Sequence, residues 1–437
     1  MWVLKSRRKQ FMSVSPDGKL AFLKPKSKNW QALDKNSFAY WRDRKLNKIT
    51  DLVLPPTDDG ISSADNEILK ENRSQLNDIL LRSLQLPNLA FFAGSGTSLG
   101  EVGGPSMWDL WKYCMFESPL STDGNECSCE LSETASNVCK KVNYNDFDNP
   151  NIEYFLSQCD AFLSFHEDLE VSTFLTKVKD IILNMCRGFI LEQNSDLSAY
   201  KMLLQKMARR RVRDPRLKVF TTNYDMTFET SASELGMMVV DGLSYTGKRK
   251  FDGKYFNYDV IMRDENEHEF VEGVFQLYKV HGSVSWVREG TNIYENNFAT
   301  ADSVCLIYPA KGKYQQAFLQ PHLELLSRFL DSLRKKNCCL IISGFGFNDD
   351  HLSEPIYSAI KSNPSMKLII ADYKCASHIE SNENKGSSKY WRLFKELSQN
   401  GYDIYFINGS FKEFTSLIPN LKALTAADQL AKVIKQV

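Results

Sequence analysis

The chain has 437 residues, of which 43% are hydrophobic and 25% charged, and its 54 basic and 54 acidic side chains give no net charge. This composition is that of a globular protein with room for two or three domains, and the charge balance excludes a general attraction to nucleic acid. The basic start has no apolar stretch behind it and no run of about 18 apolar residues occurs, so neither a secretory signal nor a membrane span is predicted.

The first 75 residues precede the first core strand and are predicted to form an N-terminal extension, residues 1–75. Phe11 to Leu23 contains two apolar runs around Pro16-Asp-Gly18, a pattern that predicts a β-hairpin. Leucines at helical spacing between Glu67 and Leu86 then predict a helix. Two interpretations of the extension stay open: a docking arm for another subunit, or a segment packed on its own domain.

A buried strand and a glycine loop follow this helix. Leu89 to Ala93 is a short apolar run, and Gly94 and Gly96 come directly after it among small hydroxylated residues. Such a loop lets the backbone approach a phosphate with free N–H groups that point at it. Two glycines also fit an ordinary turn after a strand, so this segment predicts a nucleotide site only together with the later ones.

The segment 105–213 has a helical pattern. Apolar residues recur at three- and four-residue steps from Ile152 to Leu163 and again from Phe174 to Ile190. These amphipathic helices predict a helical subdomain that is inserted after the first strand.

From residue 214 onward, strands and helices alternate. The predicted strands are 217–222, 276–280, 337–342, 367–371 and 402–407. Helices are predicted over 320–336, 349–362 and 389–400, with Asp349 and Asp350 as caps of the second. The alternation predicts an α/β fold, a Rossmann-like and mostly parallel sheet with helices on both faces. Polar residues and glycines recur where the strands end, which is where such sheets bind ligands.

Four segments, in this order along the chain, resemble motifs of the SIR2 (sirtuin) superfamily. They are the glycine loop Ala93 to Ser98, Thr222 to Asp225 in place of a Thr-x-Asn-x-Asp motif, the pair His281-Gly282, and Ser343 to His351. The last segment resembles the nucleotide-contacting loop of SIR2-like proteins from bacterial anti-phage systems. The resemblance implies an NAD-binding domain over residues 76–104 and 214–437, and it leaves the extension and the helical insertion outside.

Two features of deacetylating sirtuins are missing. After the His-Gly motif the cysteines are Cys305, Cys338, Cys339 and Cys375, so the two Cys-x-x-Cys pairs of a structural zinc site are absent. Gly104 to Leu110 also stands where a Pro-Asp-Phe-Arg segment is expected. The departures favour the SIR2-like NAD-cleaving effectors over protein deacylases, and no metal is predicted.

The resemblance implies catalytic roles for Asn223, His281 and Asp225. Asn223 can hydrogen-bond ribose hydroxyls and a water, Asp225 can accept from the nicotinamide carboxamide, and His281 can accept a proton near neutral pH. Structural roles are the alternatives: a turn residue for Asn223, a cap of helix 226–235 for Asp225, and a buried, backbone-bonded histidine for His281.

The resemblance also implies a set of residues that bind NAD. Ser343, Gly344 and Gly346 are expected to face the adenosine half and its phosphates, Asp372 the adenosine ribose, and Asn408 the adenine. The whole predicted binding set is Ala93, Gly94, Ser95, Gly96, Thr97, Ser98, Thr222, Ser343, Gly344, Phe345, Gly346, Asp372 and Asn408.

The predicted activity is that of an NAD glycohydrolase, which forms nicotinamide and ADP-ribose and acts in antiviral defence by abortive infection. An NAD-dependent protein deacylase and a non-catalytic NAD-binding subunit stay open as alternatives. The resemblance implies a homo-oligomer with a HerA-type ATPase or, alternatively, an Argonaute-like sensor as partner, and no direct contact with nucleic acid or membrane. Ten cysteines without a repeated spacing predict free thiols and a cytoplasmic location.

Overall fold

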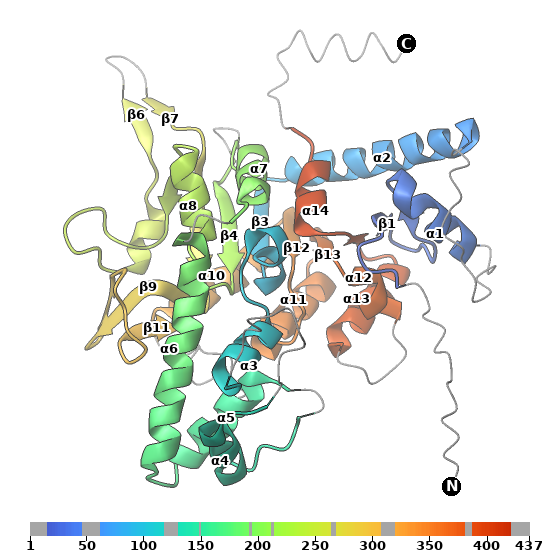
Figure 1. The fold of residues 1–437 in the computed structure, drawn as a ribbon. Coiled ribbons are helices and arrows are strands. Elements are labelled where there is room, and N and C mark those ends of the chain that lie inside the picture. Colours follow the sequence, from blue (N-terminus) through green and yellow to red (C-terminus); the bar gives the residue numbers. More distant parts are fainter. Residues whose placement is uncertain are drawn as a thin grey trace, which may run out of the picture.

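The computed structural model describes residues 15–45, 62–117, 130–147, 150–191, 195–210, 214–263, 268–306, 320–380 and 387–420. At its centre is a nine-stranded sheet in the order β2-β1-β14-β13-β12-β3-β4-β8-β5 (Figure 1). The strands are β1 (Ala21–Leu23), β2 (Gln31–Ala32), β3 (Asn88–Ala93), β4 (Leu217–Thr221), β5 (Met238–Val240), β8 (Val274–Lys279), β12 (Cys338–Ser343), β13 (Lys367–Asp372) and β14 (Ile404–Asn408). All neighbours from β14 to β5 pair in parallel, which confirms the predicted sheet type.

Helices cover both faces of this sheet, as predicted. One apolar cluster joins the sheet to α10 (His322–Arg334), α11 (Asp350–Ser362), α12 (Cys375–Glu380) and α13 (Lys389–Gln399). A second cluster, on the other face, joins it to α2 (Ser63–Leu84), α7 (Ser198–Met207), α8 (Thr227–Glu234) and α14 (Phe411–Leu417). Central strands such as β12 are buried along their whole length, because both of their faces are covered.

The helical insertion forms a third apolar cluster. It consists of α3 (Met107–Met115), α4 (Glu133–Lys141), α5 (Ile152–Leu163) and α6 (Leu169–Leu191), which extend below the sheet in Figure 1. The next helix, α7, packs on the sheet through Tyr200, Leu203 and Leu204. The insertion seen in the structure therefore ends with α6, earlier than the predicted boundary at residue 213.

The N-terminal segment joins the central sheet. β1 pairs antiparallel with β14 on one side and with β2 on the other, and α1 (Lys35–Lys45) follows. Both edges of Ala21 to Leu23 are thus occupied, so the predicted hairpin across Pro16 to Gly18 is wrong; its first arm, 11–14, lies outside the described residues. Of the two interpretations of the extension, residues 15–45 show the segment packed on its own domain.

Two small antiparallel sheets were not predicted. One is β10-β9-β11, built from β9 (Gly282–Glu289), β10 (Asn292–Glu295) and β11 (Val304–Leu306), and the other pairs β6 (Ile261–Arg263) with β7 (His268–Phe270). β9 begins directly after His281, so this sheet continues the chain from the carboxyl end of β8.

The loops that follow β3 and β12 pack backbone against backbone. Gly94 N donates to Ser343 O and Gly96 N donates to Gly344 O, both at 2.9 Å, while Thr97 N donates to Gly94 O at 3.1 Å. A Cβ on Gly94 would lie 2.4 Å from Gly344 O, and Gly344 itself has a φ of +62°. The prediction of free N–H groups is therefore wrong at these three positions, and the glycines serve the close approach of two loops.

We expect Gly94→Ala to destabilise the fold by about 1–3 kcal/mol, because its Cβ would meet fixed backbone atoms. Gly346→Ala is the matched control in the same region, since its Cβ would meet only the end of the Asn348 side chain, at 3.2 Å. Thermal unfolding of both purified variants measures the difference. Equal losses of stability would contradict the backbone contact as the cause.

Candidate functional site

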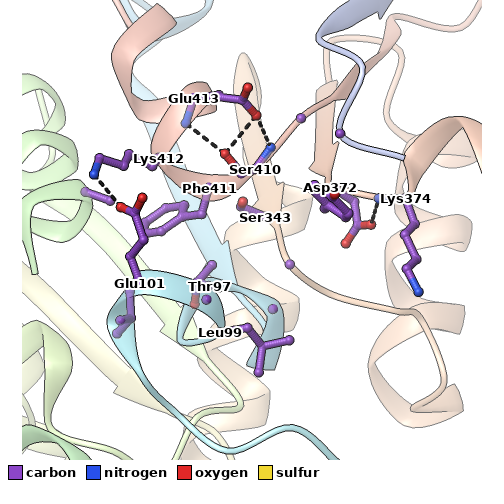
Figure 2. A pocket seen from close by; sticks show the side chains of 18 of the residues that line it. Thr97, Leu99, Glu101, Ser343, Asp372, Lys374, Ser410, Phe411, Lys412 and Glu413 are labelled. Carbon is purple, nitrogen blue, oxygen red and sulfur yellow. Dashed lines mark hydrogen bonds and ion pairs between the residues drawn. The ribbon is translucent and has the colours of Figure 1, made fainter. Parts of the chain in front are cut away.

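The largest described cavity lies at the carboxyl edge of the sheet, where the strand order reverses. The chain runs from β3 outward to β4 and β8 on one side, and from β12 outward to β13 and β14 on the other. Open α/β sheets bind ligands at such a point, between the two central strands. The cavity has a volume of about 780 Å³ and is lined by the loops after β3, β12, β13 and β14 (Figure 2). This volume is typical of cavities that hold a small organic ligand.

The structure divides the predicted binding set into two groups. Those that line the cavity are Ser95, Gly96, Thr97, Ser343, Gly344 and Asp372. Those that do not are Ala93, Gly94, Ser98, Thr222, Phe345, Gly346 and Asn408. The first group lies on the loops after three neighbouring strands, β3, β12 and β13, at the carboxyl edge of the sheet.

Asn408 has a structural role that the sequence did not show. It is fully buried; its Oδ1 accepts from Ala376 N at 2.8 Å, and its Nδ2 donates to Pro16 O at 2.9 Å and to Lys19 O at 2.8 Å. The amide is saturated by backbone partners, so the expected contact with adenine is replaced by a clamp on the N-terminal segment. Phe345 is likewise a packing residue, 5% exposed, with its ring 4.8 Å from that of Phe92.

Several cavity residues were missed. Lys412 bridges Glu101 and Asp196 across the cavity wall, with 3.1 Å between Lys412 Nζ and Asp196 Oδ2 (Figure 2). The side chain of Ser198 and that of Lys412 hold the pKa of Asp196 below its usual range. Gly18 also lines the cavity, so the N-terminal segment supplies part of the wall. The polar residues after β14 could have indicated this part of the cavity wall. The sequence prediction used only the first of them, Asn408.

Asp372 is the acidic residue of the cavity that ends β13. Its Oδ1 accepts from Lys374 N at 2.8 Å, and burial raises the pKa of its carboxyl to about 6. The carboxylate of Asp372 therefore gains or loses its charge close to neutral pH.

Asn223 follows β4 and is held in a buried polar network. Its Nδ2 donates to Thr97 Oγ1 at 3.1 Å and to Ser98 Oγ at 3.0 Å, and Tyr200 Oη donates to Thr97 Oγ1 at 2.8 Å. Asn223 is only 7% exposed, yet its Oδ1 has no hydrogen-bond partner among the residues that the structure describes. Such an acceptor costs about 1–3 kcal/mol when it stays unpaired, so this oxygen is suited to a ligand that supplies a donor.

Thr221 completes the motif around Asn223. Its Oγ1 accepts from Asn223 N and donates to Ala93 O, both at 3.0 Å. Thr221 stands two residues before Asn223, so the Thr-x-Asn-x-Asp spacing is intact with Thr221 as its first member. The prediction that gave Thr222, in place of Thr221, the first position of this motif is wrong.

Asp225 lies just before the following helix and closes the same network. Its Oδ1 accepts from Thr227 N at 3.1 Å and Thr227 Oγ1 at 2.6 Å, and its Oδ2 accepts from Ser98 Oγ at 2.8 Å. The N-cap position of α8 belongs to Met226, so the carboxylate of Asp225 holds the first residue of this helix from one position further out. With both oxygens engaged, Asp225 fixes the loop that carries Asn223.

A buried ion pair supports this loop from below. Lys279, the last residue of β8, donates to Asp225 O and lies 2.9 Å from Glu229 Oε1. Burial raises the pKa of Glu229, and the ammonium of Lys279 opposes that shift. Removing one partner of such a pair leaves a buried charge, so this pair holds α8 and the Asn223 loop against the end of β8.

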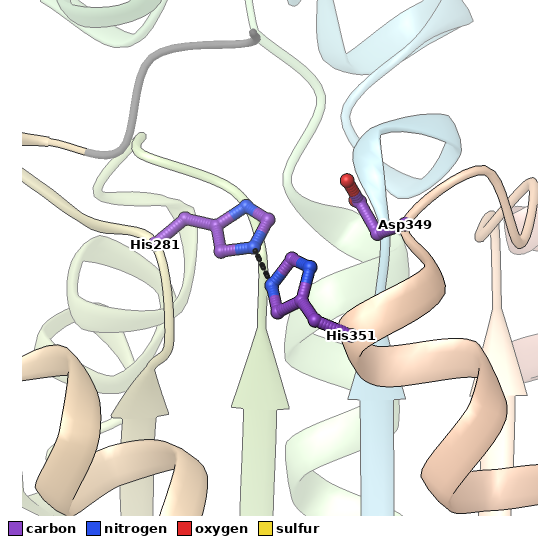
Figure 3. Close-up of side chains that lie close together, drawn as sticks. All are labelled: His281, Asp349 and His351. Carbon is purple, nitrogen blue, oxygen red and sulfur yellow. Dashed lines mark hydrogen bonds between the residues drawn. The ribbon is translucent and has the colours of Figure 1, made fainter. Parts of the chain in front are cut away.

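His281 lies one strand away from Asn223. Val280 N donates to Thr221 O at 2.9 Å, which ties the ends of β8 and β4 together. His281 is 3% exposed, and its Nε2 lies 3.1 Å from Nε2 of His351, in the first turn of α11 (Figure 3). The imidazole rings are stacked at 5.2 Å with an angle of 26°. The sequence predicted His281 as a site residue and placed His351 only at the end of the fourth motif, and it did not indicate that these two residues, 70 positions apart, lie side by side.

None of the three predicted catalytic residues lines the large cavity, but the hydrogen-bond network joins two of them, Asn223 and Asp225, to it. Thr97 and Ser98 lie in the loop that begins at the cavity and contacts both residues. His281 lies beyond this network, after the neighbouring strand β8. The described helices include none that is long and apolar enough to cross a membrane.

The comparison with protein families agrees with three of the four motifs, since the glycine loop lies outside the matched residues. A family model described as a SIR2-like domain matches residues 217–411, from the first residue of β4 to the first residue of α14. No curated protein matches the chain.

Among solved structures, the chain is similar to a complex of mutant Sir2 homologues with 2'-O-acetyl ADP ribose, at 12% identity and a TM-score of 0.37, over 82% of this chain and 96% of that one. It is also similar to a structure of Sir2 enzymes at 11% identity and a TM-score of 0.35, over 83% of this chain and 100% of that one. The segment that carries Asn223, His281 and Asp372 thus matches the SIR2-like domain.

Proposed function

We propose that the chain is an NAD glycohydrolase, which cleaves NAD⁺ with water to nicotinamide and ADP-ribose. The observation that carries the proposal is Asn223, whose buried Oδ1 has no partner among the described residues while its Nδ2 is held by two hydroxyls. A ribose hydroxyl or a water supplies the missing donor. The match of residues 217–411 to the SIR2-like domain supports NAD as the substrate.

The reaction breaks the bond between nicotinamide nitrogen and ribose C1′. The electron pair of this bond leaves with nicotinamide, which becomes neutral, and positive charge develops on the ribose. Water then forms the new bond to C1′ and loses a proton to a base. Orientation of the ribose and stabilisation of the developing charge are what a protein contributes to such a step.

The residues of the site divide this work. Asn223 holds the ribose and the water, because its amide is fixed by Thr97 and Ser98. His281 is the base that takes the proton, the usual role of an imidazole near neutral pH. Asp225 keeps the loop of Asn223 in place from α8. In the cavity, Asp372 accepts hydrogen bonds from the adenosine ribose.

Mass spectrometry of NAD incubated with the pure full-length protein tests the proposal. Nicotinamide and ADP-ribose formed with water alone are the expected products. Cleavage only in the presence of an acetylated peptide would show a protein deacylase instead. Binding of NAD without turnover would show a non-catalytic NAD-binding subunit. A cyclised product would show that water is not the acceptor.

We propose that this activity serves antiviral defence by depletion of NAD in the infected cell. The basis is the resemblance of Ser343 to His351 to the SIR2-like defence proteins. A homo-oligomer with a HerA-type ATPase, or with an Argonaute-like sensor, is the proposed form, and control through a partner explains how the host survives. Co-expression and co-purification with each class of partner tests this, with plating of phage as the readout.

Asn223→Ala is expected to lower the rate of NAD cleavage at least about 10³-fold, because the reacting ribose loses its fixed contact. The matched control is Asn88→Ala at the opposite end of the sheet, where the asparagine Nδ2 donates to a backbone oxygen, Lys336 O, at 2.7 Å. The control variant should keep full activity. Circular dichroism and product formation are measured on both, and equal activity would remove Asn223 from the mechanism.

His281→Ala is expected to lower kcat by about 10²–10⁴-fold with little change in NAD affinity, as is usual for the loss of a general base. Binding of ADP-ribose by calorimetry separates affinity from rate. The exposed His166→Ala serves as control for a histidine outside the site. An unchanged kcat in the His281 variant would exclude it as the base.

Asp372 gives NAD binding a dependence on pH. With a pKa of about 6, the carboxyl loses its charge as the pH falls from 7.5 to 5.5, and affinity for ADP-ribose should fall about fourfold. Stability runs the other way: the folded chain holds an extra proton between pH 3.8 and about 6, so stability falls as the pH rises through this window. Asp372→Asn should remove both effects, which calorimetry and thermal unfolding measure; a pH dependence that persists in the variant would contradict the assignment.

A further inference from the structure

His281, Asp349 and His351 form a cluster of metal-binding side chains at the inner end of the site. One ligand atom from each residue lies within 4.8 Å of the other two, and this is the group of three such side chains found in the described part of the chain (Figure 3). The two histidines face each other through their Nε2 atoms, 3.1 Å apart. The residues come from the end of β8 and the start of α11, so the tertiary fold creates the cluster.

Asp349 departs from the role that the sequence predicts for it. It occupies the N-cap position of α11, but its side chain makes no capping hydrogen bond to the helix. Aspartate at this position normally accepts from a backbone N–H of the first turn. A carboxylate oxygen of Asp349 instead lies within 4.8 Å of a ring nitrogen of each histidine (Figure 3).

The geometry fits a divalent transition metal. Zinc binds imidazole nitrogen at about 2.0–2.1 Å, so two nitrogen ligands of a tetrahedral ion lie roughly 3.3 Å apart. The two Nε2 atoms, at 3.1 Å, already have this separation. The carboxylate has to approach by roughly 1–2 Å to reach a distance of about 2.0–2.2 Å from the ion, which a side-chain rotation at the half-buried Asp349 provides.

We propose that His281, His351 and Asp349 bind a divalent cation of the zinc class, with water as the fourth ligand. Two imidazoles and one carboxylate are the ligand set of such ions, and both histidines then carry their proton on Nδ1. The cation occupies Nε2 of His281. If the proposed NAD cleavage is correct, the bound cation therefore prevents His281 from accepting a proton, and the enzyme is inactive.

This site is distinct from a structural zinc site made of cysteines. All eight cysteines that the structure describes are buried and free, and none belongs to the cluster. Cobalt(II) distinguishes the two chemistries, because thiolate ligands give intense near-ultraviolet charge-transfer bands and nitrogen and oxygen ligands do not. Removal of the bound cation should lower thermal stability only by the free energy of its binding, without loss of the fold.

Calorimetry with Zn²⁺ and absorption with Co²⁺, on the full-length protein after treatment with a chelator, test the binding. We expect one ion per chain, and visible Co²⁺ bands without thiolate bands. His351→Gln keeps a hydrogen-bonding side chain beside His281 but loses the ligand, and it should weaken binding at least about 100-fold. Asp349→Asn should weaken it about tenfold. His166→Gln, an exposed histidine elsewhere, should bind as the unchanged protein does.

A second measurement follows NAD cleavage as Zn²⁺ is added, each variant relative to its own metal-free rate. The unchanged protein should lose activity with the concentration dependence of binding and regain it with chelator, whereas His351→Gln should resist. Ion binding that is absent, or equal in His351→Gln, would show a hydrogen-bonded pair only and overturn the site. Binding without inhibition would overturn the inhibitory role. Binding in a chain that never cleaves NAD would leave the site standing and refute the proposed function.

Discussion

The close contact between the backbones of two loops is the constraint on which the site depends. The loops after β3 and β12 meet at Gly94, Gly96 and Gly344, where any side chain would collide with main-chain atoms. This contact sets the distance between the two loops just beyond the paired ends of β3 and β12. It also places Thr97 and Ser98 under the cavity, within reach of Asn223. The glycines therefore act on the chemistry indirectly, through the position of their hydroxylated neighbours.

The inner and outer ends of the candidate site differ in their physical character. At the inner end, Asn223, Asp225 and His281 are each less than about a tenth exposed, and nearly every polar atom has a fixed partner. The outer end is an open cavity whose wall contains an exposed ion-pair cluster of Lys412, Glu101 and Asp196. Buried networks keep one geometry, while exposed ion pairs contribute little and rearrange easily. A ligand that spans both ends meets a rigid inner half and an adaptable outer half.

Local patterns predicted the elements of the fold well, because apolar runs and helical spacing are properties of neighbouring residues. The predicted strand 337–342 and the predicted helix 320–336 are such cases, and both elements are present, as β12 and α10. The pairing of strands and the partners of side chains were harder to predict, since they depend on residues that are distant in the sequence. Asn408 looked like a ligand contact because its partners, near residues 16 and 376, are invisible from its own surroundings. His351 was missed for the same reason: only the fold brings it to His281.

The pairing of β1 with β14 has a consequence for the order in which the protein becomes competent. Ala21 lies opposite Asn408. β1 therefore cannot pair with β14 until the chain between these two distant strands has been made. Contacts of such high sequence separation form late. The residues that follow β14 form part of the cavity wall, and this part is missing during synthesis until they leave the ribosome. Gly18, which also lines the cavity, has no fixed position before then. A nascent chain therefore cannot complete the wall of the outer cavity before β1 and β14 have paired.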